Sequence, residues 1–220
     1  MGGDEISEGG DTMKPILFNG DMVRAILDGG KTVTRRPVGE DCRGEWKAIN
    51  DVRENSEYGA DVPCFLHREI AVDDTSRNIM YPKYDVGDIL YVRETWADTW
   101  TPCGQEGFVY RADGEPERFP YWGNASLLKD EVWRPSIHMP REAARIFLRV
   151  TGVRVERLQE ITDGGAMCEG VKTDNDDDLK QYGYKAGFKG AWDSIYSAKG
   201  YGWKQNPWVW VVDFEKVDKP

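Results

Sequence analysis

The 220-residue sequence has few of the side chains that bind metals or form disulfide frameworks, with only 4 cysteines and 2 histidines. The cysteines are far apart and contain no C-x-x-C pair: they are Cys42, Cys64, Cys103 and Cys168. With only His67 and His138 to add, this spacing favours neither a zinc site nor a disulfide framework. We therefore predict free thiols in a reducing cytosol, no bound metal and no other cofactor.

Long apolar runs are also missing. No stretch reaches the roughly 20 apolar residues that a membrane-spanning helix needs, and none has the pattern of a signal peptide. The sequence therefore predicts a cytoplasmic protein with no membrane partner. Its length and its 40% apolar content are enough for one domain with a hydrophobic core.

Negative charge predominates, with a net charge of −10, but it is unevenly distributed. Residues 1–12 carry four acidic residues and no basic one, whereas residues 13–37 carry five basic residues against two acidic ones. A second basic stretch runs from 134 to 154. The total argues against an extended nucleic-acid groove, and we expect any nucleic-acid contact to be local and small, in a basic pocket.

The order of the predicted elements indicates an α+β fold. Strands are expected at 14–18, near Val33, and at 86–96, 108–111, 144–158 and 208–214; helices are expected at 21–28, after Thr162, and at 188–196. Gly152 is expected to break or bulge the longest strand. Because the elements do not alternate as β-α-β, we predict a small mixed β-barrel with flanking helices. Residues 1–12 are interpreted as a disordered acidic tail and 13–220 as one domain, with an insertion of loops and one hairpin at about 38–84.

The stretch DGGKTVTRRP at 28–37 combines cations and hydroxyl groups directly after the first predicted helix. Gly29 or Gly30 can take the left-handed conformation that ends a helix. Val33, between two threonines, favours a short strand. This arrangement suits an anion, and the alternative is a solvated turn followed by an edge strand.

Three segments resemble the ASCH domains, which are relatives of the PUA-like β-barrels: residues 29–36, the turn and strand at 86–90, and the helical segment at 161–171. The sequence is most similar to the larger ASCH proteins of bacteriophages and prophages, through WRPSIHMPR at 133–141 and NPWVW at 206–210. The resemblance implies a PUA-like barrel whose cleft, beside the first helix, takes RNA or a modified nucleoside.

A small bacterial ASCH enzyme is an amidohydrolase that cleaves N4-acylated cytidines with a Thr, a Lys and a Glu. By motif, the resemblance implies Thr34 as the nucleophile, with Lys31 and Glu169 as its partners and Arg36 as a cation in the same cleft. The alternative is a non-catalytic binding module of phage origin for RNA or a modified nucleotide. A phage structural or assembly protein is a third reading.

Chemistry sets conditions on this triad. A Thr hydroxyl is a poor nucleophile until a base takes its proton, so the Lys31 amine must be neutral part of the time. Burial and the cations Arg35 and Arg36 would lower its pKa, and a nearby Glu169 would raise it. In a flat strand Lys31 and Thr34 point to opposite faces, so the pair requires Lys31 to lie in the turn.

We expect the Glu169 carboxylate within hydrogen-bond reach of the Lys31 amine, or one water away, and the Thr34 hydroxyl open to the same cavity. Arg35 and Arg36 are candidate substrate-binding cations. Four aromatic residues are candidates for stacking a base, with the core as their alternative place: Tyr91, Trp96, Trp122 and Trp133. Nothing in the sequence indicates the oligomeric state.

Overall fold

The main feature of the protein, in a computed structural model, is a five-stranded sheet in the order β1-β6-β9-β10-β2. The structure describes residues 13–39, 46–50, 64–67, 79–100, 106–114, 133–171 and 176–220. The five strands are β1 (Lys14–Leu17), β2 (Val33–Pro37), β6 (Ile89–Arg93), β9 (Phe147–Arg157) and β10 (Trp208–Val217). The β1–β6 pair is parallel and the other pairs are antiparallel. The predicted acidic tail lies outside the described residues, as do Cys42, Cys103 and Trp122.

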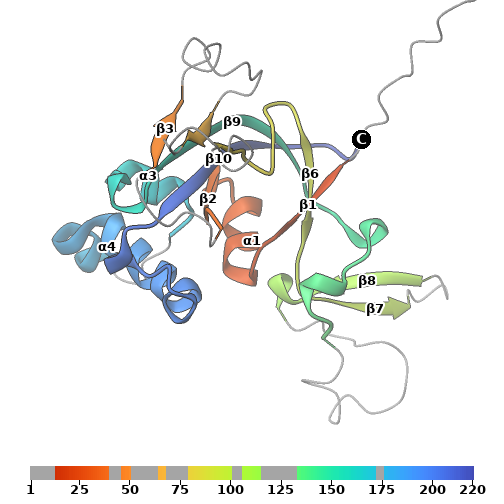
Figure 1. Cartoon of the computed structure of the whole chain (residues 1–220). Helices are drawn as coiled ribbons and strands as arrows, with labels where there is room; N and C mark the ends of the chain where they lie inside the picture. The colour runs from red at the N-terminus through yellow and green to blue at the C-terminus, as the bar shows by residue number, and fades with distance from the viewer. Residues whose placement is uncertain are drawn as a thin grey trace, which may run out of the picture.

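The sheet is open in the described part of the chain, because its edge strands β1 and β2 do not pair with each other. The separate helices and the mixed sheet confirm the predicted α+β class, but the predicted barrel is not closed. Helix α1 (Gly20–Leu27) connects the two edges and lies on the concave side of the sheet, below the long strands β9 and β10 (Figure 1). The two edges are bridged by a side chain, since Arg36 of β2 donates to the Leu17 carbonyl of β1 over 2.6 Å.

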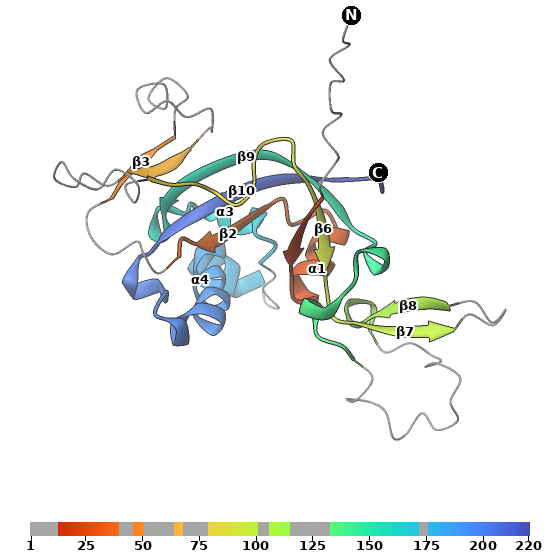
Figure 2. The same ribbon diagram turned by 45° about the vertical axis from the view of Figure 1, so that its right-hand side comes forward.

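A bulge bends the two longest strands. Asp213 pairs with Gly152, but the next residue of β10, Phe214, pairs with Val150, which leaves Thr151 as the extra residue. The predicted break at Gly152 is thus confirmed as a bulge, a feature that increases strand twist and bending. β9 and β10 arch over α1 as a result (Figure 2).

Two helices begin at capping side chains, whereas the helix predicted at 188–196 begins earlier, at Asp176. Asn19 caps α1 by accepting from the Met22 N–H, and Gly29 follows the helix at φ 76°. Thr162 caps α3 (Asp163–Cys168) in the same way, by accepting from the Gly165 N–H. The long helix α4 (Asp176–Tyr196) is kinked at Gly183 and packs against α3. No helix among the described segments has the length and apolar character needed to cross a bilayer.

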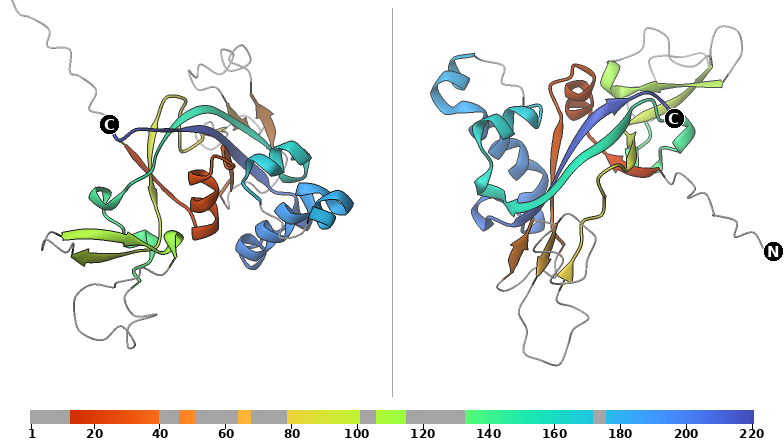
Figure 3. Two further views of the ribbon diagram at one scale, coloured as in Figure 1. Left: turned by 180° about the vertical axis from the view of Figure 1, so that it is seen from behind. Right: turned by 90° about the horizontal axis from the view of Figure 1, so that it is seen from above.

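Two smaller sheets flank the main one. The strands β7 (Trp96–Trp100) and β8 (Glu106–Tyr110) form a hairpin, at the opposite end of the molecule from α4 (Figure 3). The predicted strand at 86–96 is therefore divided between β6 and β7. The described part of the 38–84 insertion contains three strands, β3 (Lys47–Ile49), β4 (Phe65–His67) and β5 (Ile79–Met80), in place of one predicted hairpin. Strands of two or three residues are too short to show a period in the sequence.

The hydrophobic core has two parts that matter for the site. One lies between α1 and the concave face of the sheet, and it includes Phe18, Val23, Ile26, Leu90, Val150 and Phe214. The other lies where α3 and α4 cover the ends of β2 and β10, and it includes Val33, Ile161, Phe188, Trp192, Val209 and Val211. The residues 28–37 connect these two parts.

Candidate functional site

The turn after α1 brings two distant segments together. The N–H groups of Gly30 and Lys31 both donate to the Ala25 carbonyl, over 2.9 and 3.0 Å, and so close the helix. Lys31 then forms an isolated antiparallel bridge with Glu169, which directly follows α3. Lys31 therefore lies in the turn before β2, which is the position that a Lys31–Thr34 pair requires.

Close contact between the segments depends on Gly170, which has φ 76°. A Cβ atom at Gly170 would lie 2.6 Å from the Cβ of Ala25 and 2.8 Å from the Cβ of Lys31. Real Cβ atoms do not approach so closely, and φ in this range also favours glycine. Gly170 thus fixes the distance between α1 and the residue that carries the carboxylate.

The amine of Lys31 is completely buried and makes three hydrogen bonds. It donates to the Glu169 carboxylate over 2.6 Å, and to the carbonyls of Glu169 and Val33 over 2.9 Å each. The side chain of Lys31 is 0% exposed and that of Glu169 is 5% exposed. A lysine ammonium has three N–H donors, so every donor of Lys31 has an acceptor.

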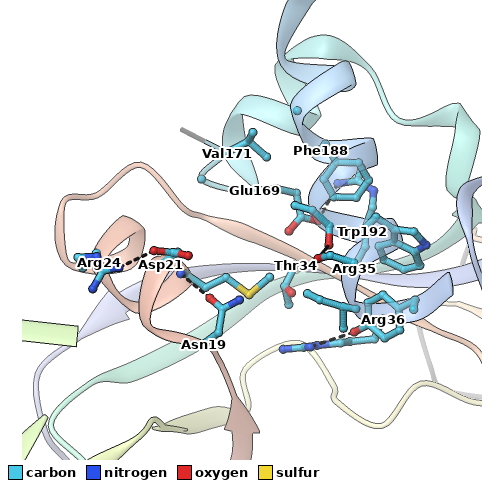
Figure 4. Close-up of a pocket in the computed structure, with 17 residues that line it drawn as sticks. Asn19, Asp21, Arg24, Thr34, Arg35, Arg36, Glu169, Val171, Phe188 and Trp192 are labelled. Atoms are coloured by element: carbon cyan, nitrogen blue, oxygen red, sulfur yellow. Dashed lines mark hydrogen bonds and ion pairs between the residues drawn. The ribbon is translucent and has the colours of Figure 1, made fainter. Parts of the chain in front are cut away.

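Glu169 is shared between two cations. Its second carboxylate oxygen accepts from Arg35 over 3.1 Å (Figure 4). Arg35 in turn contacts Glu156 over 2.8 and 2.9 Å. Because the side chain of Arg35 is also only 3% exposed, Lys31, Arg35 and Glu169 are all buried, and only Glu156 of the two cations and two carboxylates is partly exposed. In such networks each buried charge is compensated by an opposite charge, so removing one member leaves an uncompensated charge.

The electrostatic environment of Lys31 acts in two directions. Burial lowers the pKa of its amine below the usual value, and this is the largest effect. The charge and hydrogen bond of Glu169 raise the pKa of Lys31, while Arg36 and Arg35 lower it further. The balance is a lowered pKa, which favours loss of a proton from Lys31 relative to a lysine in water.

A cavity of about 480 Å³ adjoins this network, between α1, β2 and α4. Its volume lies within the range of small-molecule sites. Four of the predicted site residues are in its wall or at its rim: Thr34, Arg35, Arg36 and Glu169. Lys31 is not in the wall, and its side chain is completely buried. Thr34 is only 2% exposed.

The two sides of the cavity differ in character. Asn19, which caps α1, and Asp21 and Arg24 of α1 form the polar side, and Phe188 and Trp192 of α4 form the aromatic side (Figure 4). Tyr196 continues the aromatic side, with its ring 4.3 Å from that of Trp192. The spacing of the aromatic residues predicts one apolar helix face, and only the fold shows that this face meets a cavity.

Arg36 is held at the rim by three contacts. Its guanidinium donates to the Tyr196 hydroxyl over 3.2 Å and to the Leu17 carbonyl over 2.6 Å, and it lies 5.2 Å from the centre of the Phe18 ring. These contacts orient the group without a carboxylate partner among the described residues. The charge of Arg36 therefore remains available to an anionic ligand.

Two predicted binding residues lie elsewhere. Tyr91 and Trp96 pack in a separate cluster with Met139 and Phe147, and neither lines the cavity beside Thr34. Leu90 and Val92 of β6 face the core beside α1, so Tyr91 between them points to the opposite face of the sheet, and Trp96 belongs to the separate hairpin. Across the described segments, no three His, Cys, Asp or Glu side chains gather in a group that could hold a metal ion.

The fold and site define an α+β protein with a buried ion network at the wall of a cavity. No family model matches the sequence, and no curated protein matches it. Among solved structures, the chain is similar to protein EF3133 of Enterococcus faecalis V583, described as DUF984, with 10% identity and a TM-score of 0.36. The match covers 89% of this chain and 66% of that protein's length. This likeness is too weak to assign a family or an activity.

Proposed function

We propose that the protein is an ASCH-domain amidohydrolase that removes the acyl group from an N4-acylated cytidine or a similarly modified base. The proposal rests on one observation: the Lys31 amine and the Glu169 carboxylate, 138 residues apart in sequence, meet in a buried pair, and Glu169 lines the same cavity as Thr34. The resemblance to ASCH domains implies a catalytic triad of these three residues, and their convergence in space supports it.

The reaction would proceed in two steps. The Thr34 hydroxyl attacks the acyl carbon, its proton passes to a base, and the cytosine N4 leaves with a proton as the free amine. Water then attacks the resulting threonine ester, which releases the carboxylic acid and restores the hydroxyl of Thr34. Arg36 lies at the rim, where its positive charge can stabilise an oxyanion.

Lys31, the base in this reaction, must lose a proton before it can accept the proton of Thr34. The ammonium form of Lys31 has no lone pair for the Thr34 proton, and all three of its N–H groups are donated to other acceptors. Transfer of one proton across the 2.6 Å contact to Glu169 would produce a neutral amine and a neutral acid, and the amine must then turn its lone pair from Glu169 to Thr34. The lowered pKa of Lys31 makes this transfer less costly.

The test is hydrolysis of N4-acetylcytidine, followed by chromatography of the cytidine formed. Thr34→Ala should reduce turnover by about 10³-fold or more, as expected for loss of a nucleophile. Thr34→Ser keeps a hydroxyl and should retain measurable turnover. Thr32→Ala is the matched control, because Thr32 is exposed two residues away and lies outside the cavity wall. Equal turnover in Thr34→Ala and Thr32→Ala would remove Thr34 from the mechanism.

A second function, a non-catalytic reader of RNA or a modified nucleotide, is favoured by one specific observation. All three N–H groups of Lys31 already have acceptors, and Lys31 does not line the cavity. Arg36 and the aromatic face of α4 do line it. A reader needs those groups but no activated Thr. Binding of short RNA that survives Thr34→Ala, is lost in Arg36→Ala and is accompanied by no turnover would support the reader and contradict the hydrolase.

A further inference from the structure

A second cavity of about 470 Å³ lies on the other side of Arg36, where the edge strands β1 and β2 face each other. Its wall includes Leu17, Gly39, Tyr81, Lys83 and Tyr84. The site described above does not use this cavity. Its volume is close to that of the first cavity, so each is large enough for one nucleoside-sized group.

Arg36 is the residue that both cavities share. One terminal nitrogen of its guanidinium donates to Tyr196, in the wall of the first cavity. The other donates to the carbonyl of Leu17, in the wall of the second. These bonds use two of its five N–H groups, and no other described residue accepts from it. The guanidinium thus presents donors at the boundary between the two cavities.

The second cavity combines aromatic rings with positive charge. Tyr81 is 49% exposed. Tyr84 is buried, and its hydroxyl is fixed by donation to the Pro15 carbonyl over 2.8 Å. Lys83 lies 5.4 Å from the centre of the Tyr84 ring and adds a second cation. The two cavities thus have aromatic residues on either side of the shared Arg36. This order matches the base, phosphate and next base of a single-stranded nucleic acid.

We infer that the second cavity is a subsite for the nucleotide adjacent to the modified base, with Arg36 contacting the phosphate between the two. The substrate is then a single-stranded polynucleotide rather than a free nucleoside. This inference rests on the proposed function, because it places the modified base in the first cavity.

The test compares two ligands by calorimetric titration of full-length Thr34→Ala, which keeps an acylated ligand intact. The ligands are N4-acetylcytidine and a trinucleotide with N4-acetylcytidine at its centre, in ribose and deoxyribose forms. One additional stacked base predicts that the trinucleotide binds about tenfold more tightly or better. This advantage should decrease as salt increases, because it includes a phosphate contact. The two sugar forms distinguish RNA from DNA as the source of the strand.

Two variants in this background probe the second cavity. A Cβ atom at Gly39 meets nothing within 4 Å, so Gly39→Phe would place a ring in the cavity without a backbone clash. Lys83→Ala removes its cation. Both should reduce the trinucleotide advantage, to within about twofold for Gly39→Phe. Gly190→Phe is the matched control, since Gly190 is also open to space but lines neither cavity, and it should keep the full advantage.

Equal affinity for the two ligands in Thr34→Ala would overturn the inference. So would a loss of affinity in Gly39→Phe and Lys83→Ala that is the same for both ligands. Thermal melting identifies a variant that does not fold, and Lys83→Ala alone then decides. The hydrolysis assay distinguishes the two proposals. Turnover of the nucleoside without a preference for the trinucleotide would contradict the subsite but not the hydrolase. A preference for the trinucleotide without any turnover would contradict the hydrolase but not the subsite.

Discussion

Replacing Glu169 by Gln should strongly destabilise the protein, because it leaves the buried Lys31 amine without its counter-charge. The side chains of the pair are 0% and 5% exposed, so water cannot replace the lost carboxylate. Breaking a buried ion pair on one side costs about 3–5 kcal/mol. For a chain of this size each kcal/mol lowers the melting temperature by about 2–4 °C, so we expect a decrease of about 6–20 °C.

A double-mutant cycle isolates this interaction. Lys31→Met combined with Glu169→Gln removes both charges, and the pair of substitutions should be less harmful than the sum of the two singles by about 1–3 kcal/mol. Glu215→Gln is the control, because Glu215 forms an ion pair with Arg149 over 3.2 Å in which both side chains are more than half exposed. An exposed pair of this kind contributes less than about 1 kcal/mol.

The defect of Glu169→Gln should also depend on pH. Loss of Glu169 removes the interaction that raises the pKa of Lys31, so the pKa of this amine falls further below its usual value of 10.5. Between the folded and unfolded pKa values of Lys31, the unfolded chain binds more protons, and stability therefore rises with pH. The difference in unfolding free energy between wild type and variant should shrink as the pH approaches 10.5.

The measurement is urea unfolding of the four proteins of the cycle and the control, from neutral pH to about pH 10. A loss in Glu169→Gln as small as that in Glu215→Gln would refute a buried charge at Lys31. Strict additivity in the cycle would refute the coupling of the pair. A deficit that grows with pH would show that the charge balance around Lys31 is reversed.

Three further outcomes are expected. Gly170→Ala should destabilise by about 2–4 kcal/mol in thermal unfolding, against about 1 kcal/mol for Gly29→Ala, because both have φ 76° but only Gly170 has a Cβ clash; equal losses would contradict the close approach. Burial raises the pKa of the Cys64 thiol to about 12, so Cys64 should resist alkylation at pH 8 until the chain unfolds, which mass spectrometry of the labelled peptides can check. Tyr196→Phe should weaken binding of an anionic ligand several-fold while changing the melting temperature little, because it releases one contact of a partly exposed Arg36.

Local patterns in the sequence were sufficient for the elements that carry the site. The glycine after α1 and the Thr162 cap are signals within a few residues, and each lies where the pattern predicts. The bulge beside Gly152 is local in the same sense. The proximity of Lys31 and Glu169 was predicted through the resemblance, since no local pattern relates residues 138 apart. Their chemical roles stay predictions.

Tertiary structure alone decided which side chains surround Thr34. The sequence indicates equally well that Tyr91, Trp96 and Trp192 are apolar residues of regular elements. Only the tertiary structure packs α4 against the start of β2, so that Trp192 lines the cavity, whereas Tyr91 of β6 and Trp96 of β7 pack in a separate cluster and do not. Tertiary structure alone also decided that the sheet is open and that two cavities meet at Arg36. Strand order and edge contacts arise from long-range packing, which the local periodicity of a sequence does not encode.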